Sequence, residues 1–383
     1  MRRATLLPVV ALLVWAGLAP VATGERAAAA SLPTRLTSAE FWKLSADLSE
    51  PGGSFRSENL VSNEHTFQYV IPALEKTVKP GGVYLGVAPD QNFTYMIATR
   101  PRMAFIVDIR RGNLLQHLLY KALFELSADR VDFVARLFSK RRPPGLGPKS
   151  TVVEIFSAFD RMQTSVEQYK EMYQQNVQAI REHLLKKHRF TLTQADLDQL
   201  EGIYFAFFWE GPALRYSMSP SGLGGPRFGT NFPTYEELMM QTDFDGQARG
   251  YLASEENFRF IKGLQDKNLI VPVVGNFAGP KALRSVGRYI RERGGIVSAY
   301  YVSNVEQYLF QENLFEEFAR NVSTLPADDS SVFIRSVSTR FGYSGPYLWT
   351  DGRASALDPI RPFVRDFQAG RIKTYYDVNA RSR

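Results

Sequence analysis

VYLGVAPDQNFTYMIATRPRMAFIVDIRR, residues 83–111, contains two short apolar runs separated by a turn and a short segment of helical character. The runs Val83–Val87 and Met103–Ile109 are apolar at consecutive positions and rich in β-branched residues, which is typical of parallel strands buried on both faces. The segment that begins at Pro89 is long enough for one brief helix between them. The stretch therefore predicts a strand–helix–strand unit with parallel strands.

The same alternation returns near the end of the chain. Apolar runs at 268–279 (NLIVPVVGNFAG), 296–304 (IVSAYYVSN) and 330–338 (SSVFIRSVS) predict strands, and the intervening segments 280–295 and 304–322 predict helices. YLWTD, residues 347–351, is the candidate partner of the last strand. Strands and helices that alternate in this way predict an α/β fold with a doubly wound, mostly parallel sheet.

The middle of the chain is predicted to be helical. The pattern is helical from Asn113 to about Lys187, apart from the linker RRPPGLGP at 141–148, and GIYFAFFWEGP at 202–212 fits either a strand or a buried helix. The segment 219–234 (SPSGLGGPRFGTNFPT) is rich in Gly, Ser and Pro, which favours a lid, a binding loop or a passive insertion. The expected organisation is a signal peptide over 1–30, N-terminal helices and the first half of the Rossmann-like sheet over 31–112, a helical insertion or cap over 113–267, and the second half over 268–383.

The first thirty residues have the composition of a secretory signal. Arg2 and Arg3 precede the apolar run 6–22, and AAAAS at 27–31 supplies small residues for cleavage. We therefore expect export to the periplasm or the extracellular space and a mature protein that begins near Ser31. An uncleaved membrane anchor is the alternative, because the apolar run approaches the length of a short span.

Charge and cysteine content exclude several classes of function. The net charge of the 383-residue chain is only +7, and its one compact basic run, Lys140–Arg142, enters a loop, so we expect no nucleic-acid partner. A membrane partner is expected only through the signal segment, and the oligomeric state stays open. The chain has no cysteine, which rules out disulfides, thiol catalysis and thiolate metal sites.

The ligand site is expected at the carboxyl ends of the strands. In open α/β sheets, ligands bind in the crevice where the strand order reverses. We therefore expect the segments that follow Val87, Ile109, Val274 and Val302 to meet around a shared hollow. The candidate cofactor-binding residues are the polar and turn residues of these segments: Gly86, Asp90, Gln91, Asn92, Asp108, Asn276 and Asn304.

Two acidic residues bear on the kind of ligand. The first turn lacks the G-x-G-x-x-G pattern that cradles a pyrophosphate, and Asp90 would place a carboxylate at the helix start. Asp108 lies 22 positions after Gly86, close to the offset at which an acidic residue accepts hydrogen bonds from a ribose. The alternative is that Asp90 only caps a helix and that Asp108 caps the next turn or pairs with Arg110.

VYLGVAPDQNFTY followed by MAFIVDIRR resembles the first two motifs of class I S-adenosylmethionine-dependent methyltransferases. The resemblance implies a doubly wound sheet with an antiparallel strand near its end, S-adenosylmethionine as a possible cofactor, Gly86 and its neighbours against the methionine part, and Asp108 against the ribose hydroxyls. Tyr84 and Ala88 stand where that family has an acidic residue and a second glycine, and no N-P-P-Y motif follows the fourth strand. YLASEENFRF (251–260) and VSNVEQYLF (302–310) are similar to an uncharacterised family of exported bacterial proteins.

These patterns leave two functions open. The first is a non-enzymatic module, small-ligand-binding or envelope-associated, that keeps a degenerate methyltransferase-like fold. The alternative is a group-transfer enzyme with a nucleoside-type cofactor such as S-adenosylmethionine. No residue is assigned a catalytic role, and a small molecule is the expected partner in both.

Histidines and aromatic residues outside these segments are expected to be structural. The chain has four histidines and no H-E-x-x-H motif, and His183 and His188 lie in a polar helix, so we expect them to be solvated and predict no metal site. The aromatic cluster around Tyr204 and Trp209 is expected to belong to the core.

Overall fold

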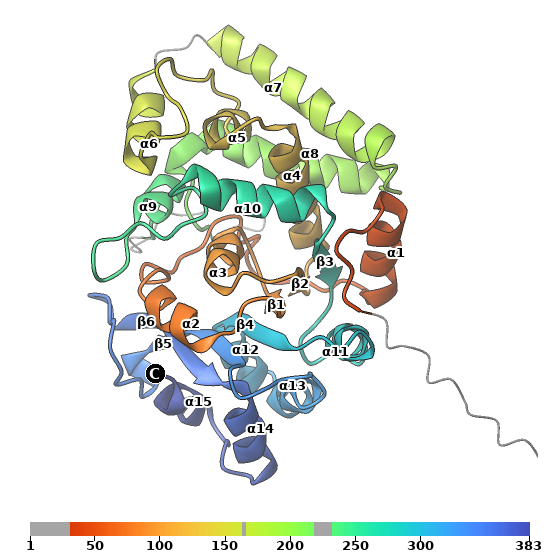
Figure 1. Ribbon diagram of the computed structural model, residues 1–383, viewed down its shortest axis with the longest axis vertical. Helices are drawn as coiled ribbons and strands as arrows, with labels where there is room; N and C mark the ends of the chain where they lie inside the picture. Colours follow the sequence, from red (N-terminus) through yellow and green to blue (C-terminus); the bar gives the residue numbers. More distant parts are fainter. Residues whose placement is uncertain (1–30, 163–165, 218–231) are drawn as a thin grey trace, which may run out of the picture.

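A computed structural model describes residues 31–162, 166–217 and 232–383 (Figure 1). The expected signal peptide and most of the segment 219–234 lie outside the described residues. Within the described part of the chain, no helix combines the length and the apolar character needed to span a membrane.

The helices and strands follow one another along the chain in the order in which Figure 1 labels them. Up to the third strand they are α1 (Ser38–Leu48), α2 (Ile71–Thr77), β1 (Val83–Gly86), α3 (Gln91–Thr99), β2 (Met103–Asp108), α4 (Arg111–Leu126), α5 (Arg130–Leu137), α6 (Val152–Arg161), α7 (Val166–Glu182), the π-helix η1 (His183–Lys187), α8 (Gln194–Glu210), the 3₁₀ turn η2 (Gly211–Ala213), α9 (Tyr235–Met240) and α10 (Glu255–Asp266). They continue with β3 (Ile270–Val274), α11 (Ala282–Glu292), β4 (Val297–Ser303), α12 (Val305–Gln311), α13 (Phe315–Val322), β5 (Val332–Ser338), the 3₁₀ turn η3 (Thr339–Phe341), β6 (Arg353–Pro359), α14 (Ile360–Gln368) and α15 (Tyr375–Arg381).

The strands form one six-stranded sheet in the order β3-β2-β1-β4-β5-β6. Neighbouring strands from β3 to β5 are parallel, and β6 runs antiparallel to β5. The α/β prediction with a mostly parallel sheet is therefore confirmed. The strand order reverses between β1 and β4, because β2 and β3 are added on one side of β1 and β4 on the other.

The apolar runs became strands because both of their faces are covered. Every residue of β1, β2 and β3 is buried, which explains why these runs are apolar at consecutive positions instead of alternating. Helix α3 connects β1 to β2, as the quoted stretch predicts. The edge strand β3 is covered by α1 and α4, both of which contact it.

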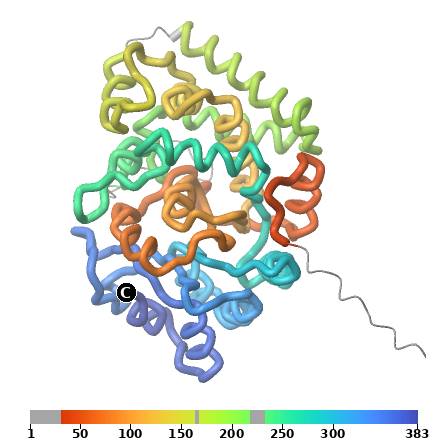
Figure 2. Tube along the Cα trace, in the orientation of Figure 1, coloured from red at the N-terminus to blue at the C-terminus, as the bar shows by residue number. Residues whose placement is uncertain are grey.

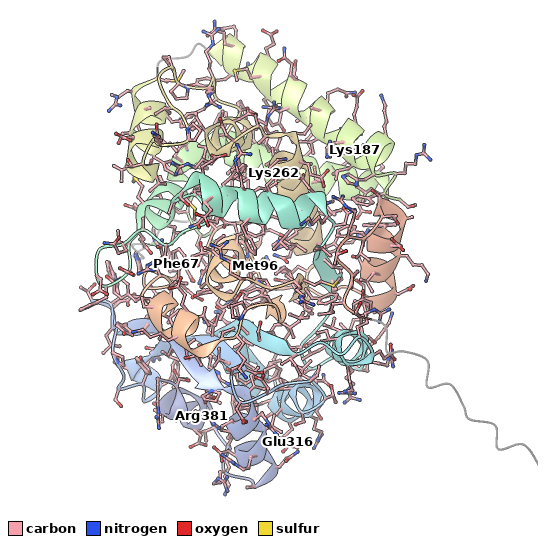
Figure 3. All side chains as sticks on the ribbon, in the orientation of Figure 1. Phe67, Met96, Lys187, Lys262, Glu316 and Arg381 are labelled. Carbon is pink, nitrogen blue, oxygen red and sulfur yellow. The ribbon has the colours of Figure 1, made fainter. Side chains whose placement is uncertain are left out.

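The helices between β2 and β3 gather in the upper part of the molecule, above the sheet in Figures 1 and 2. Helix α4 connects the two parts: it is buried from Gly112 to Phe124, and it packs against β2 and β3 as well as α8 and α10. A single apolar core runs through both parts. Phe67 and Met96, which Figure 3 labels, belong to that core, whereas Lys187 and Glu316 are exposed.

Three expectations from the sequence differ from the structure, and one alternative that the sequence left open is settled by it. The partner of β5 is Arg353–Pro359 and not 347–351, which lies in the turn before β6, where the Gly352 amide bonds the Trp349 carbonyl. Residues 64–77 have apolar side chains at helical spacing, which predicts a helix, but α2 begins only at Ile71. The helix expected over 304–322 is broken at Asn313, whose φ is +57°. The ambiguous segment 202–212 contains the second half of α8.

A buried charge cluster joins the second half of the sheet to the last helix. The guanidinium of Arg335 on β5 is paired with Glu306 of α12 and Asp358 of β6, and Arg381 of α15 also pairs with Asp358. Burial opposes the charge of Arg335, but the two carboxylates raise its pKa above the usual value. Four elements therefore depend on one fully paired set of charges.

Replacing Arg335 with alanine should lower the free energy of unfolding by about 3–5 kcal/mol, because it leaves two buried carboxylates without their partner. Urea unfolding followed by circular dichroism measures this. The matched control is Arg361→Ala, which removes a solvent-exposed pair with Asp329 and should cost less than about 1 kcal/mol. Equal losses in the two variants would contradict the assignment.

Candidate functional site

A cavity of about 140 Å³ lies at the carboxyl ends of β1, β2, β3 and β4. The expectation that the four strand tips share a hollow is therefore confirmed. The tip residues that line it are Val87 and Ala88 after β1, Asp108, Ile109 and Arg110 at the end of β2, Gly275, Asn276 and Phe277 after β3, and Ser303 and Asn304 at the end of β4. We call this cavity the tip pocket.

Three of the candidate cofactor-binding residues line the tip pocket, and four do not. Asp108, Asn276 and Asn304 face it, whereas Gly86, Asp90, Gln91 and Asn92 are not among its lining residues. The aromatic side chains of Tyr84 and Phe93 do not fill the pocket. Tyr84 hydrogen-bonds Asn92, and Phe93 packs against the ring of His117.

The outer wall of the tip pocket is an irregular segment, residues 50–64, that crosses the strand tips. We call it the strap. Its Glu50 amide donates to the carbonyl of Val274, the last residue of β3, at 3.0 Å, and its Gly53 amide donates to the carbonyl of Ile109, just after β2, at 2.8 Å. Gly53 has no room for a side chain, because a Cβ there would lie 2.7 Å from the side chain of Ile109. The strap supplies Ser54, Phe55, Asn59 and Asn63 to the pocket wall.

Sequence reasoning missed the strap. EPGGS, residues 50–54, has the composition of a turn and by itself predicts only the end of a preceding helix. The available signal was the non-periodic stretch that follows it, because a compact fold rarely leaves so long a segment without regular structure unless it covers something.

Glu50 fixes one end of the strap. Its carboxylate accepts hydrogen bonds from the backbone amides of Asn276, Lys281 and Ala282 at 2.8, 3.1 and 3.2 Å. The last two amides belong to the start of α11, where a helix attracts an anion. The protein therefore fills this anion position with its own carboxylate.

Glu64 fixes the other end. Its buried carboxylate accepts hydrogen bonds from the hydroxyls of Tyr301 and Ser303 on β4 and from the amide of Gln91. Gln91 also pairs with Ser62 of the strap. Gln91 therefore spends its side-chain hydrogen bonds on the strap and does not line the tip pocket.

Asp108 and Arg110 form a buried pair on the wall of the tip pocket. The Asp108 carboxylate accepts from Arg110 Nε at 2.9 Å, from Nη2 at 2.8 Å and from the Arg110 backbone amide at 2.9 Å. Arg110 Nη1 donates to the strap carbonyls of Ser57 and Glu58. The alternative in which Asp108 caps the turn and pairs with Arg110 is confirmed, and the pair ties the strap to the end of β2.

The turn after β1 is held by Asn92. Its side-chain amide donates to the carbonyls of Val87 at 2.8 Å and Pro89 at 2.6 Å, and its oxygen accepts from Tyr84. Gly86 is required for this arrangement, because a Cβ there would lie 1.9 Å from Asn92 Oδ1. Ala88 adopts a left-handed φ of +65°, a conformation that favours glycine. Gly86 and Asn92 therefore shape the turn from inside the protein.

Asp90 lies behind this turn in a set of buried polar groups. The hydroxyl of Tyr251 donates to it at 3.0 Å and also hydrogen-bonds Tyr235 at 2.6 Å. Burial raises the pKa of Asp90 to about 7. Burial also lowers the pKa of His117 to about 4, although its Nε2 hydrogen-bonds the carbonyl of Ala88 at 2.9 Å. Asp90 is the N-cap of α3 but makes no side-chain capping bond, so its expected capping role is wrong.

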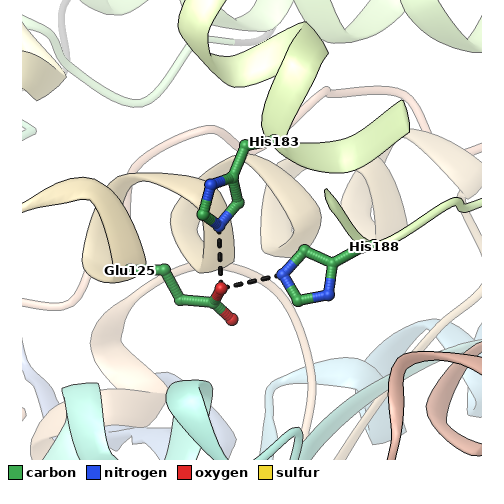
Figure 4. Close-up of side chains that lie close together, drawn as sticks. All are labelled: Glu125, His183 and His188. Atoms are coloured by element: carbon green, nitrogen blue, oxygen red, sulfur yellow. Dashed lines mark hydrogen bonds and ion pairs between the residues drawn. The ribbon is translucent and has the colours of Figure 1, made fainter. Parts of the chain in front are cut away.

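A second cluster lies away from the tip pocket. Glu125, His183 and His188 bring carboxylate and imidazole atoms within 4.8 Å of one another (Figure 4). Both histidines are buried, so the expectation that they are solvated is wrong. The aromatic cluster also divides: Tyr204 and Phe207 are buried in the core, whereas Trp209 is exposed.

The fold and the tip pocket define a doubly wound α/β protein with a hollow of about 140 Å³ at the point where the strand order reverses. Residues 59–355 match a family model described as "Domain of unknown function (DUF7790)". The match covers more than half of the chain, so the chain belongs to this family. It begins in the strap and ends within β6, and therefore includes all four strand tips. None of the curated proteins matches the chain.

The pH dependence of stability should change when Asp90 is replaced by asparagine. Because folding raises the pKa of Asp90 from 3.8 to about 7, its carboxyl stabilises the fold fully below pH 3.8 and loses that contribution as the pH rises to about 7. The difference between the free energies of unfolding, Asp90→Asn minus the unmodified protein, should therefore increase between pH 4 and 7 and stay constant at higher pH. Chemical unfolding at several pH values measures this. The exposed control Asp245→Asn should give a profile parallel to that of the unmodified protein, and a parallel profile for Asp90→Asn would contradict the prediction.

Proposed function

We propose that the chain is an exported, non-enzymatic module that binds a small polar ligand in the tip pocket. The observation that carries the proposal is the convergence of four strand tips on one hollow whose outer wall is the strap. Open α/β sheets bind their ligands at this place. The expected export follows from the sequence of residues 1–31.

The lining of the tip pocket favours a ligand that carries hydroxyl or amide groups. Side-chain amides come from Asn59, Asn63, Asn276 and Asn304, and hydroxyls come from residues such as Ser54 and Tyr308. The volume of about 140 Å³ is smaller than the roughly 300–1,000 Å³ of sites for drug-sized ligands. A compact polar molecule therefore fits the pocket better than a whole dinucleotide.

The charges around the tip pocket favour a neutral or cationic ligand. The positive charge of Arg110 is balanced by Asp108, and Glu312 adds a carboxylate at the rim. The amides at the start of α11, which could bind a phosphate, are already occupied by Glu50. These contacts argue for binding without phosphate recognition.

Group transfer with a nucleoside-type cofactor such as S-adenosylmethionine is the second candidate. Two observations favour it: the antiparallel strand β6 at the end of the parallel sheet, which fits the methyltransferase-like expectation, and the position of Asp108 in the pocket wall at the end of β2. A cofactor of that size would require the strap to move and Asp108 to share its hydrogen bonds with Arg110. The first candidate needs neither change.

Thermal unfolding in the presence of millimolar compounds separates the two candidates. The panel contains small polyols and amides, together with adenosine, S-adenosylmethionine and S-adenosylhomocysteine. We expect a small polar compound to raise the midpoint in the unmodified protein and to have no effect on Asn304→Leu, which removes a polar group from the pocket wall. Gln311→Leu, at the far end of the helix that follows Asn304 and outside the pocket, should keep the response.

Each outcome of this experiment is informative. A midpoint shift with S-adenosylmethionine and S-adenosylhomocysteine that Asn304→Leu abolishes would replace the first candidate with the second. No shift with any compound, or a shift that Asn304→Leu leaves intact, would overturn binding at the tip pocket.

Export predicts that the protein recovered from its native cells begins near Ser31. The intact mass of the protein purified from cells that express the full chain checks this. The uncleaved control is the same chain made in a cell-free system without membranes. A full-length mass in the membrane fraction would support the anchor instead, and a full-length mass in the cytoplasm would contradict export.

A further inference from the structure

We propose that Glu125, His183 and His188 form a binding site for a divalent transition-metal ion, with zinc as the ion whose ligand preferences the residues fit. The three side chains come from the end of α4 and from the turn after α7. Both histidine Nε2 atoms point at the same carboxylate oxygen, Glu125 Oε2, at 2.7 and 2.8 Å (Figure 4). The site is separate from the tip pocket and does not rest on the proposed function.

A π-helix brings the two histidines together. In an α-helix, residues five positions apart differ by roughly 500° of rotation and so lie on different faces. Here α7 continues into the π-helix η1, and the amide of His188 bonds the carbonyl of His183 five residues earlier at 3.0 Å. This wider turn places both imidazoles against α4. π-helical turns are rare and occur frequently at functional sites.

The ligand set is one that zinc prefers. Two imidazoles and one carboxylate are the protein ligands of open zinc sites, in which the fourth position is left for water. All three side chains are buried. A groove of about 500 Å³ lies beside the cluster, and its lining includes Trp42, Lys187 and, of the three proposed ligands, His188.

Outer hydrogen bonds orient the ligands. Ser38 Oγ hydrogen-bonds His188 Nδ1 at 2.8 Å, which leaves Nε2 directed at Glu125. Lys121 Nζ donates to the other carboxylate oxygen, Glu125 Oε1, and to the carbonyl of Gln265. Such outer partners fix the tautomer of a ligating histidine and the orientation of a ligating carboxylate.

Two lysines compete with a cation at this site. Lys121 is buried and stays on Oε1, so Oε2 is left for the ion. Lys187 also contacts Oε2, at 2.9 Å, but its side chain is 58% exposed, and its ammonium group is free to turn into solvent. Binding then replaces the two imidazole–carboxylate hydrogen bonds: each imidazole gives up its Nε2 proton and carries a proton on Nδ1 instead, which in His188 is the atom that hydrogen-bonds Ser38 Oγ. Each Nε2 atom also moves about half an ångström away from Glu125 Oε2 to allow zinc bond lengths of roughly 2.0–2.1 Å.

Titration calorimetry of the EDTA-treated, buffer-exchanged protein with zinc chloride tests the site. We expect one ion per chain, and binding weakened more than about tenfold in His183→Ala and in His188→Ala. The matched control is His65→Ala, which removes a histidine outside the cluster and should leave zinc binding unchanged.

Lys187→Ala keeps the proposal testable even if both histidine variants fail to fold. Because this exposed lysine opposes a cation at Oε2, its removal should tighten zinc binding several-fold. Zinc binding that is absent from the unmodified protein, unchanged in the histidine variants, or unchanged or weakened in Lys187→Ala would overturn the proposal.

Discussion

The geometry of the parallel sheet constrains everything around the tip pocket. Parallel strands end at the same edge, and the reversal of strand order between β1 and β4 leaves a gap there that connections on either side do not fill. The strap covers this gap and is fixed at its two ends by Glu50 and Glu64. The gap and the strap together form the tip pocket, where we propose that the ligand binds.

Charged groups that suggest a ligand in the sequence serve the fold instead. Glu50 occupies the amides at the start of α11, and Asp108 is held by Arg110, which in turn binds the strap. Asp90 lies behind the turn after β1. Each group joins segments that are distant in the chain, so the polar ligand contacts that remain in the tip pocket come mainly from neutral amides and hydroxyls.

The sequence predicts the elements whose pattern is local. Buried parallel strands require consecutive apolar residues, so β1 to β5 could be located, and the rule for open sheets then placed Asp108, Asn276 and Asn304 at the pocket. Strand β6 was missed because RASALDP contains residues with little preference for strands, and it is stabilised by pairing with β5.

Contacts between distant segments were not predictable in this way. The orientation of Asn92 depends on the absence of a side chain at Gly86, and the strap depends on the carbonyls of Ile109 and Val274. The sequence predicts solvated side chains for His183 and His188 because they lie in a polar helical stretch. The π-helix η1 packs against α4 and places both histidines next to Glu125.

Hydrogen–deuterium exchange of the full protein, with and without the compound that raises its unfolding midpoint most, tests the central claim most directly. The account predicts slower exchange in peptides that cover the strap, residues 50–64, and the start of α12, with no change in α7 and α8. Protection confined to the helices between β2 and β3, or faster exchange throughout the strap, would contradict a ligand held between the strand tips.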